Sequence, residues 1–156
     1  MTALIILAFL VATLFALAYT TRRRFGVLGL ALLAGSYLAS TWTDTVTPAV
    51  EQAGVVIAAP PLTTIVAFGL TLLPALVLFI NSPVYSSKRS KLIGSLVFSL
   101  FAVVLLIQPL GNALIIDETS QDLFYWVDAN YTLLVTVGLL AAIGDLFLAK
   151  TKLGRR

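Results

Sequence analysis

Long apolar stretches separated by short polar segments dominate the chain. Each of five such stretches approaches or exceeds the ~20 residues that an α-helix needs to cross a membrane. In lipid the backbone must satisfy its hydrogen bonds within the protein, and the alternating pattern of a transmembrane barrel is absent, so helices are predicted. We therefore predict an all-α membrane protein with one polytopic membrane domain over residues 1–156. Its bundle of about five transmembrane helices would cover residues 3–19, 25–42, 62–80, 92–110 and 127–149.

The first stretch has an alternative interpretation as a cleaved signal peptide, because residues 16–18 resemble a small-residue cleavage site. A signal peptide carries its basic residues before the apolar part. Here the three arginines at 22–24 follow it, so a retained first helix is favoured.

The charged residues predict how the helices are oriented. All ten basic residues fall into three clusters, within 22–24, 88–91 and 150–156, and two predicted helices separate each cluster from the next. The three clusters therefore lie on one side, and six of the seven acidic residues lie in the two loops of the other side. Basic loops remain in the cytoplasm. This predicts an amino terminus outside and a carboxyl terminus in the cytoplasm.

The first outer loop contains a helical pattern of its own. Thr47 is placed to cap a helix that begins at Pro48, and apolar residues recur near the helical period until Pro60 stops it. Residues 48–59 are therefore predicted as a short amphipathic helix, either lying on the outer leaflet or re-entrant. The second outer loop, 111–128, is interpreted as an acidic segment followed by aromatic residues that anchor it at the membrane surface.

Composition supports the membrane assignment and narrows the chemistry. Hydrophobic residues make up 60 % and charged residues 11 %, whereas soluble domains carry roughly 25 % charged residues. The mean hydropathy is +1.03. Cysteine and histidine are both absent, which excludes thiol chemistry, Cys/His metal sites and histidine-based nucleophile systems. We predict a non-enzymatic protein without cofactor or metal.

The net charge of +3 and the isoelectric point near 9.5 raise the question of nucleic acid. The basic clusters are short, adjoin the predicted helices and contain no interleaved aromatic residues. Membrane lipids with anionic headgroups are therefore the predicted partners, and no nucleic acid is expected. Self-association or contact with other membrane proteins is also expected.

Asp145 is the one charged residue well inside a predicted helix, since Asp128 falls at the outer end of the fifth. An ionisable residue in a membrane is a functional candidate, either as a proton site or as an ion ligand. The structural alternative is that Asp145 pairs with a nearby basic residue or reaches interfacial water, because it lies only five residues before Lys150. We favour the structural role.

Other polar positions also allow two interpretations. Pro74 interrupts the third helix and frees a carbonyl near Leu70, which can build a substrate site or simply bend the helix. Gln108, Pro109 and Asn112 form either a solute-binding vestibule or an ordinary helix end. In both cases the structural interpretation is favoured.

Small residues recur at close-packing intervals in three of the predicted helices. They let helix backbones approach each other, either inside the bundle or at a self-association face, and the sequence leaves both open. The residues are Gly35, Ala39, Ser36, Ser40, Ser95, Ser99, Ala102, Gly138 and Ala142.

Residues 20–110 resemble the colicin V production protein family of small bacterial inner-membrane proteins. The resemblance lies in a short first helix, the basic residues before Gly26, the outer amphipathic segment and the basic turn from Ser87 into Gly94. The chain differs in having one glycine in the fourth helix and a clear fifth helix. The resemblance implies a bacterial inner-membrane location and a role in envelope homeostasis or peptide-toxin export, with no catalytic residues.

The leading hypothesis is a scaffold or accessory subunit in envelope maintenance or in a secretion or export system. The alternative is a small oligomeric channel or transporter, which would need a polar path through the bundle. The two differ in whether intramembrane polar residues converge on one cavity. The residues that decide this are Ser36, Ser99, Gln108, Thr136 and Asp145.

Overall fold

The computed structural model describes residues 2–55, 57, 60–85, 87–113 and 118–153, and these form six α-helices. Five of the helices are long and apolar enough to cross a membrane, and only α5 is not. The predicted all-α bundle is therefore confirmed. The helices are α1 (Thr2–Thr21), α2 (Phe25–Gln52), α3 (Leu62–Asn81), α4 (Lys88–Ala113), α5 (Glu118–Ala129) and α6 (Tyr131–Leu153).

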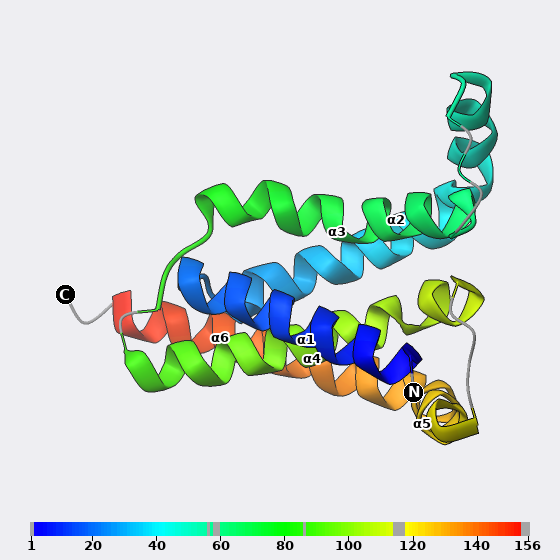
Figure 1. Ribbon diagram of the computed structural model, residues 1–156. Coiled ribbons are helices and arrows are strands. Elements are labelled where there is room, and N and C mark those ends of the chain that lie inside the picture. The colour runs from blue at the N-terminus through cyan, green and yellow to red at the C-terminus, as the bar shows by residue number, and fades with distance from the viewer. Residues whose placement is uncertain (1, 56, 58–59, 86, 114–117, 154–156) are drawn as a thin grey trace.

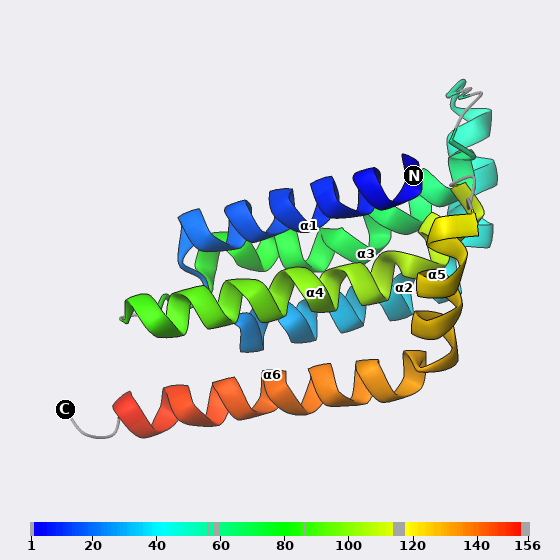
Figure 2. The same cartoon turned by 60° about the horizontal axis from the view of Figure 1, so that its bottom comes forward.

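Helix α4 lies at the centre of the bundle and packs against every other helix (Figures 1 and 2). Its middle carries the large buried side chains Phe98, Phe101 and Leu106. The ring of Phe101 meets that of Phe25 in α2 edge to face, with centroids 5.9 Å apart, a preferred geometry for aromatic pairs. The core thus forms where α1, α2, α3 and α6 surround α4.

Two glycines allow particularly close helix contacts. A Cβ on Gly138 of α6 would lie 2.1 Å from the ring of Phe101, and one on Gly35 of α2 would lie 2.0 Å from the backbone oxygen of Thr71 in α3. Only glycine fits at either position. The six residues predicted to mediate helix packing are all buried within this one chain: Gly35, Ala39, Ser95, Ser99, Gly138 and Ala142.

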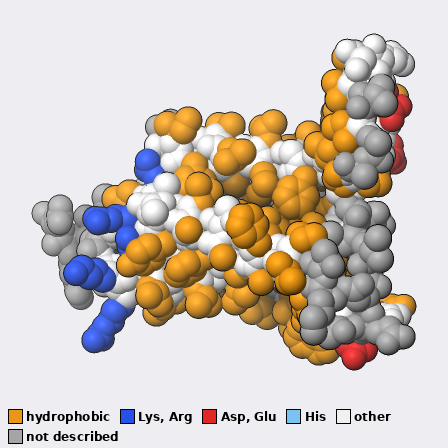
Figure 3. Space-filling model, viewed as in Figure 1, with side chains coloured by type: hydrophobic (Ala, Val, Ile, Leu, Met, Phe, Trp, Pro, Cys, Tyr) orange, Lys and Arg blue, Asp and Glu red, His pale blue; other side chains and the backbone are white. Residues whose placement is uncertain are grey.

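Charges gather at the two ends of the bundle, with apolar side chains between them (Figure 3). We call the end formed by residues 22–24 and the start of α4 the basic end. The other end, formed by α5 and the C-terminal part of α2, we call the acidic end; it carries Asp44, Glu51, Asp122 and Asp128. Such an apolar band between charged ends is typical of a membrane-spanning bundle.

The segment after the second predicted span differs from the expectation. Helix α2 does not end near residue 42 but continues through Pro48 to Gln52, and Thr47 is not an N-cap, since its hydroxyl donates to the carbonyl of Thr43 at 2.7 Å. Residues 48–52 are helical as predicted but belong to α2. The C-terminal part of α2 turns away from the bundle (Figure 1). Pro48 explains the turn, because it lacks the N–H that would bond to residue 44.

Helix α5 was not expected. Residues 118–129 form a helix of their own, and the following span begins at Tyr131 rather than 127. Phe124 and Val127 are buried against Ile107 of α4. Buried residues at positions 120, 124 and 127 have helical spacing. The helical spacing of these residues was therefore present in the sequence, but the surrounding acidic residues led us to interpret the segment as a loop.

Candidate functional site

The loops at the basic end are joined to each other. The N–H of Tyr85, between α3 and α4, donates to the carbonyl of Arg22, between α1 and α2, at 2.8 Å. The N–H of Arg24 donates to the carbonyl of Pro83 at 3.0 Å. These bonds satisfy backbone groups at the helix ends and tie the α1–α2 and α3–α4 hairpins together.

The guanidinium of Arg23 closes the C-terminal end of α3. It donates to the carbonyl of Ile80 at 2.9 Å and also to that of Ser82. A cation at a helix C-terminus interacts favourably with the last, unpaired carbonyls. Arg23 therefore contributes to helix pairing as well as to the basic charge of this end.

The N-terminus of α2 is capped by side chains from distant parts of the chain. Its N-cap residue, Arg24, makes no side-chain cap. Instead the Tyr85 hydroxyl accepts the N–H of Phe25 at 3.0 Å, and a carboxylate oxygen of Asp145 in α6 accepts the N–H of Gly26 at 3.0 Å. An anion at this position is favoured by the helix dipole and by the free N–H groups.

Glycines make room for both capping side chains. A Cβ on Gly26 would lie 3.2 Å from the capping carboxylate oxygen of Asp145 and 2.6 Å from the carbonyl oxygen of Ala142, and one on Gly94 of α4 would lie 2.3 Å from the Tyr85 hydroxyl. The sequence flagged both glycines but gave no signal for Tyr85. A tyrosine in a short loop has no periodicity that would reveal its partner.

Tyr85 is held in its neutral form. Burial raises the pKa of its phenol to about 12; the Phe25 N–H acts in the opposite direction, and the Asp145 carboxylate adds to the rise. The guanidinium of Arg24 lies over the Tyr85 ring, 5.4 Å from its centroid, in cation–π geometry. Tyr85 is therefore a structural acceptor at ordinary pH.

The structure thus places Asp145 at a helix junction. Its carboxylate faces the start of α2, and its own backbone carbonyl accepts from the Arg24 guanidinium at 3.4 Å. Among the described residues, no group of three or more acidic side chains could hold a metal ion. The geometry here is that of a helix cap.

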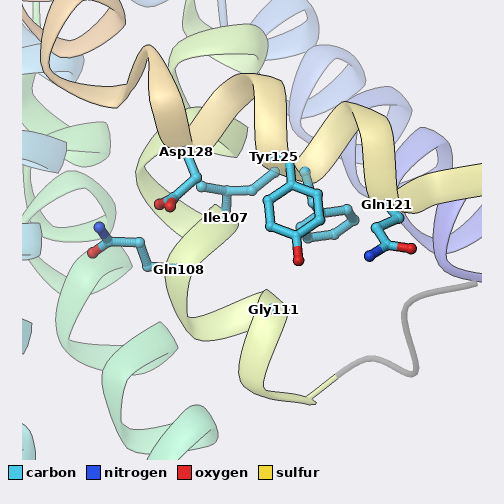
Figure 4. Close-up of a pocket in the computed structure, with 7 residues that line it drawn as sticks. Ile107, Gln108, Gly111, Gln121, Tyr125 and Asp128 are labelled. Atoms are coloured by element: carbon cyan, nitrogen blue, oxygen red, sulfur yellow. The ribbon is translucent and has the colours of Figure 1, made fainter. Parts of the chain in front are cut away.

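A cavity of about 610 Å³ lies at the acidic end, between α4 and α5 (Figure 4). Helix α5 contributes Gln121, Tyr125 and Asp128, which share one face because they are spaced by four and three residues. Helix α4 contributes Ile107 and Gln108. The sequence singled out Gln108 but not its α5 neighbours. The side chain of Asn112, also predicted for this vestibule, lies outside the described residues.

Gln108 also lines a second cavity, of about 550 Å³, between α2, α3, α4 and α6. Ser36 and Thr71 supply hydroxyls there, and each hydroxyl donates to a carbonyl of its own helix. Thr71 precedes Pro74 by less than one turn, and α3, which is continuous through Pro74, meets α2 here. Pro74 itself does not line the cavity.

The five polar residues named at the outset are mostly dispersed. Ser36 and Gln108 line the same cavity. Ser99 lines an apolar groove between α1 and α4, Thr136 is exposed on α6, and Asp145 lies at the basic end. The described residues therefore do not form one continuous polar path.

Comparison with protein-family models, with curated proteins and with solved structures gave no match.

Proposed function

We propose that the protein is a non-enzymatic, polytopic membrane scaffold or accessory subunit in envelope maintenance or in a secretion or export system. The proposal rests on where the intramembrane polar residues lie and which groups they bond to. Asp145 caps a helix, the hydroxyls of Ser99 and Thr136 bond within their own helices, and only Ser36 and Gln108 share a cavity. The envelope or export setting comes from the resemblance of residues 20–110 to the colicin V production family.

In this proposal the basic end faces the cytoplasm of a bacterial inner membrane and the acidic end faces outward, following the positive-inside rule. Arg22, Lys88 and Arg89 are exposed at the basic end. Anionic lipid headgroups are their natural counterions, each basic residue contributing about 1 kcal/mol near such a surface.

Site-specific photo-crosslinking in the native membrane tests the scaffold. A crosslinking phenylalanine analogue would replace Phe9 of α1, Leu76 of α3 or Leu140 of α6, which are 74 %, 55 % and 63 % exposed. A scaffold should give one discrete adduct with another protein from one of these faces, while the other faces give lipid adducts. Only self-adducts, or no protein adduct from any face, would contradict the proposal.

A small oligomeric channel or transporter is the second candidate, because Gln108 lines both the cavity at the acidic end and the one between the helices. Purified protein in liposomes should then let a monovalent cation enter, which a trapped fluorescent indicator of that cation reports. Replacing Gln108 by Leu should abolish this cation entry, whereas Gln121→Leu, which changes only the outer cavity, should retain most of it. Liposomes as tight as protein-free controls would exclude this candidate.

A further inference from the structure

The cavity at the acidic end has the features of a ligand site. Its volume of about 610 Å³ falls in the range of roughly 300–1,000 Å³ typical of small-molecule pockets. Phe124, which is buried, and Ile107 form its apolar wall. In Figure 4 the carboxylate of Asp128 and the amide of Gln108 extend on the same side, and the Tyr125 hydroxyl and the Gln121 amide point toward the space beside Gly111.

The polar side chains of this cavity are exposed. Within the part of the chain that the structure describes, the side chains of Gln108, Gln121 and Asp128 have no hydrogen-bond partner. The cavity therefore presents one carboxylate, two amides and a phenol to an occupant.

Electrostatics favours a cationic occupant. All ten basic residues of the sequence lie in segments 22–24, 88–91 and 150–156, and the described parts of these segments are at the basic end. The acidic end carries Asp44, Glu51 and Asp122 in addition to Asp128. Clustered charge of one sign raises the local concentration of the opposite sign. The Asp128 carboxylate attracts a cation by its charge, and the amide oxygen of Gln108, which extends on the same side in Figure 4, is a further acceptor.

We propose that this cavity binds a small organic cation, an alkylammonium group attached to an apolar body. The ammonium group would lie at the Asp128 carboxylate, on the side where the Gln108 amide also extends in Figure 4, and the apolar body would lie against Phe124 and Ile107. This assignment is independent of the scaffold or channel role, because it concerns equilibrium binding to the isolated protein.

Calorimetric titration of the purified protein in maltoside micelles tests the site, with benzyltrimethylammonium as the probe. Its neutral isostere, in which a quaternary carbon replaces the nitrogen, reports partition into micelles. We expect saturable binding of the cation and none of the isostere. Equal heats from both compounds, or no saturation by the cation, would overturn the proposal.

Variants on one helix then localise the binding. Asp128→Asn removes the charge and should weaken binding about tenfold or more. Asp122→Asn is the matched control, since it removes a carboxylate from the same helix outside the cavity. It should change affinity less than about twofold, because exposed charges are screened by salt. Equal losses from Asp122→Asn and Asp128→Asn would show that general surface charge attracts the probe, which would overturn the site.

The ammonium group could come from a free amine or from a lipid headgroup. Nanodiscs of phosphatidylglycerol and nanodiscs that also contain phosphatidylethanolamine separate the two sources. A weaker apparent affinity for the probe in the second preparation, absent in Asp128→Asn, assigns the site to the headgroup. Unchanged affinity assigns it to a free amine.

Discussion

At the scale of single residues, the N-terminus of α2 is capped by side chains that come from far away in the sequence. Asp145 accepts the N–H of Gly26 across a separation of 119 residues, and Tyr85 accepts the N–H of Phe25 across 60. Capping residues normally lie at the helix end itself. Here the capping position holds Arg24, which points its guanidinium at α6 and at the Tyr85 ring instead.

The capping geometry predicts how Asp145 responds to substitution. Asp145→Asn keeps an oxygen that can accept the Gly26 N–H and removes the charge, so we expect a loss of about 1 kcal/mol in the free energy of unfolding. Asp145→Leu leaves that N–H without an acceptor, and the loss should be about 1–3 kcal/mol. Thermal unfolding in mild detergent measures both, with Asp122→Asn as the control for charge alone.

The same variants separate structure from activity. If Asp145 serves as a cap, whatever function the protein has should persist in Asp145→Asn. A variant that folds and assembles normally but is inactive would instead assign a proton or cation to Asp145.

The sequence could predict only half of this arrangement. Asp145 is visible as the one charge within an apolar helix, and its closeness to Lys150 correctly placed it near the basic end. Its partner could not be predicted, because a backbone N–H carries no residue-specific signal. Tyr85 was missed for the same reason.

At the scale of helices, the apolar segments were easy to predict and their ends were not. Hydropathy identifies the ends of α1 and α3 to within about two residues, because a long apolar run is hard to interpret as anything but a membrane-spanning helix. It fails where polar residues continue a helix, as in α2 beyond residue 42, and where a helix is too polar to span a membrane, as in α5. For the cavity at the acidic end, the sequence therefore singled out Gln108 of α4 but not the residues of α5 that line it.

Two glycines of α6 provide a matched test of helix packing. Gly138→Ala puts a methyl group into the Phe101 ring, whereas nothing lies within 4 Å of a Cβ on Gly144. We expect Gly138→Ala to lower stability by about 1–3 kcal/mol and Gly144→Ala to leave it unchanged or raise it by up to about 1 kcal/mol. Thermal unfolding of the two variants under the same conditions measures the difference.

A second-site change strengthens this test. Phe101→Ala alone should be destabilising, because it empties a buried aromatic site. Combined with Gly138→Ala it should cost less than the sum of the two changes, because the added methyl group then has space. Equal stabilities of the Gly138→Ala and Gly144→Ala proteins would contradict the observed contact.

At the scale of the whole molecule, the separation of charge predicts the orientation in the membrane. The sequence contains no cysteine, so single cysteines can be introduced at the exposed positions Ser87, near the basic end, and Thr45, in the C-terminal part of α2. An impermeant thiol reagent added to intact cells should label Thr45→Cys and not Ser87→Cys. Both should react after the membrane is permeabilised. Labelling of Ser87→Cys from outside would reverse the proposed orientation.

The remote capping of α2 has a consequence for biosynthesis. Helix α2 is synthesised before α6, yet the acceptor of its Gly26 N–H lies in α6. Until α6 inserts, the start of α2 keeps an unsatisfied donor near the membrane. A nascent chain is therefore chemically distinct from a finished one at this junction. The junction can close only after α6 has been made and inserted.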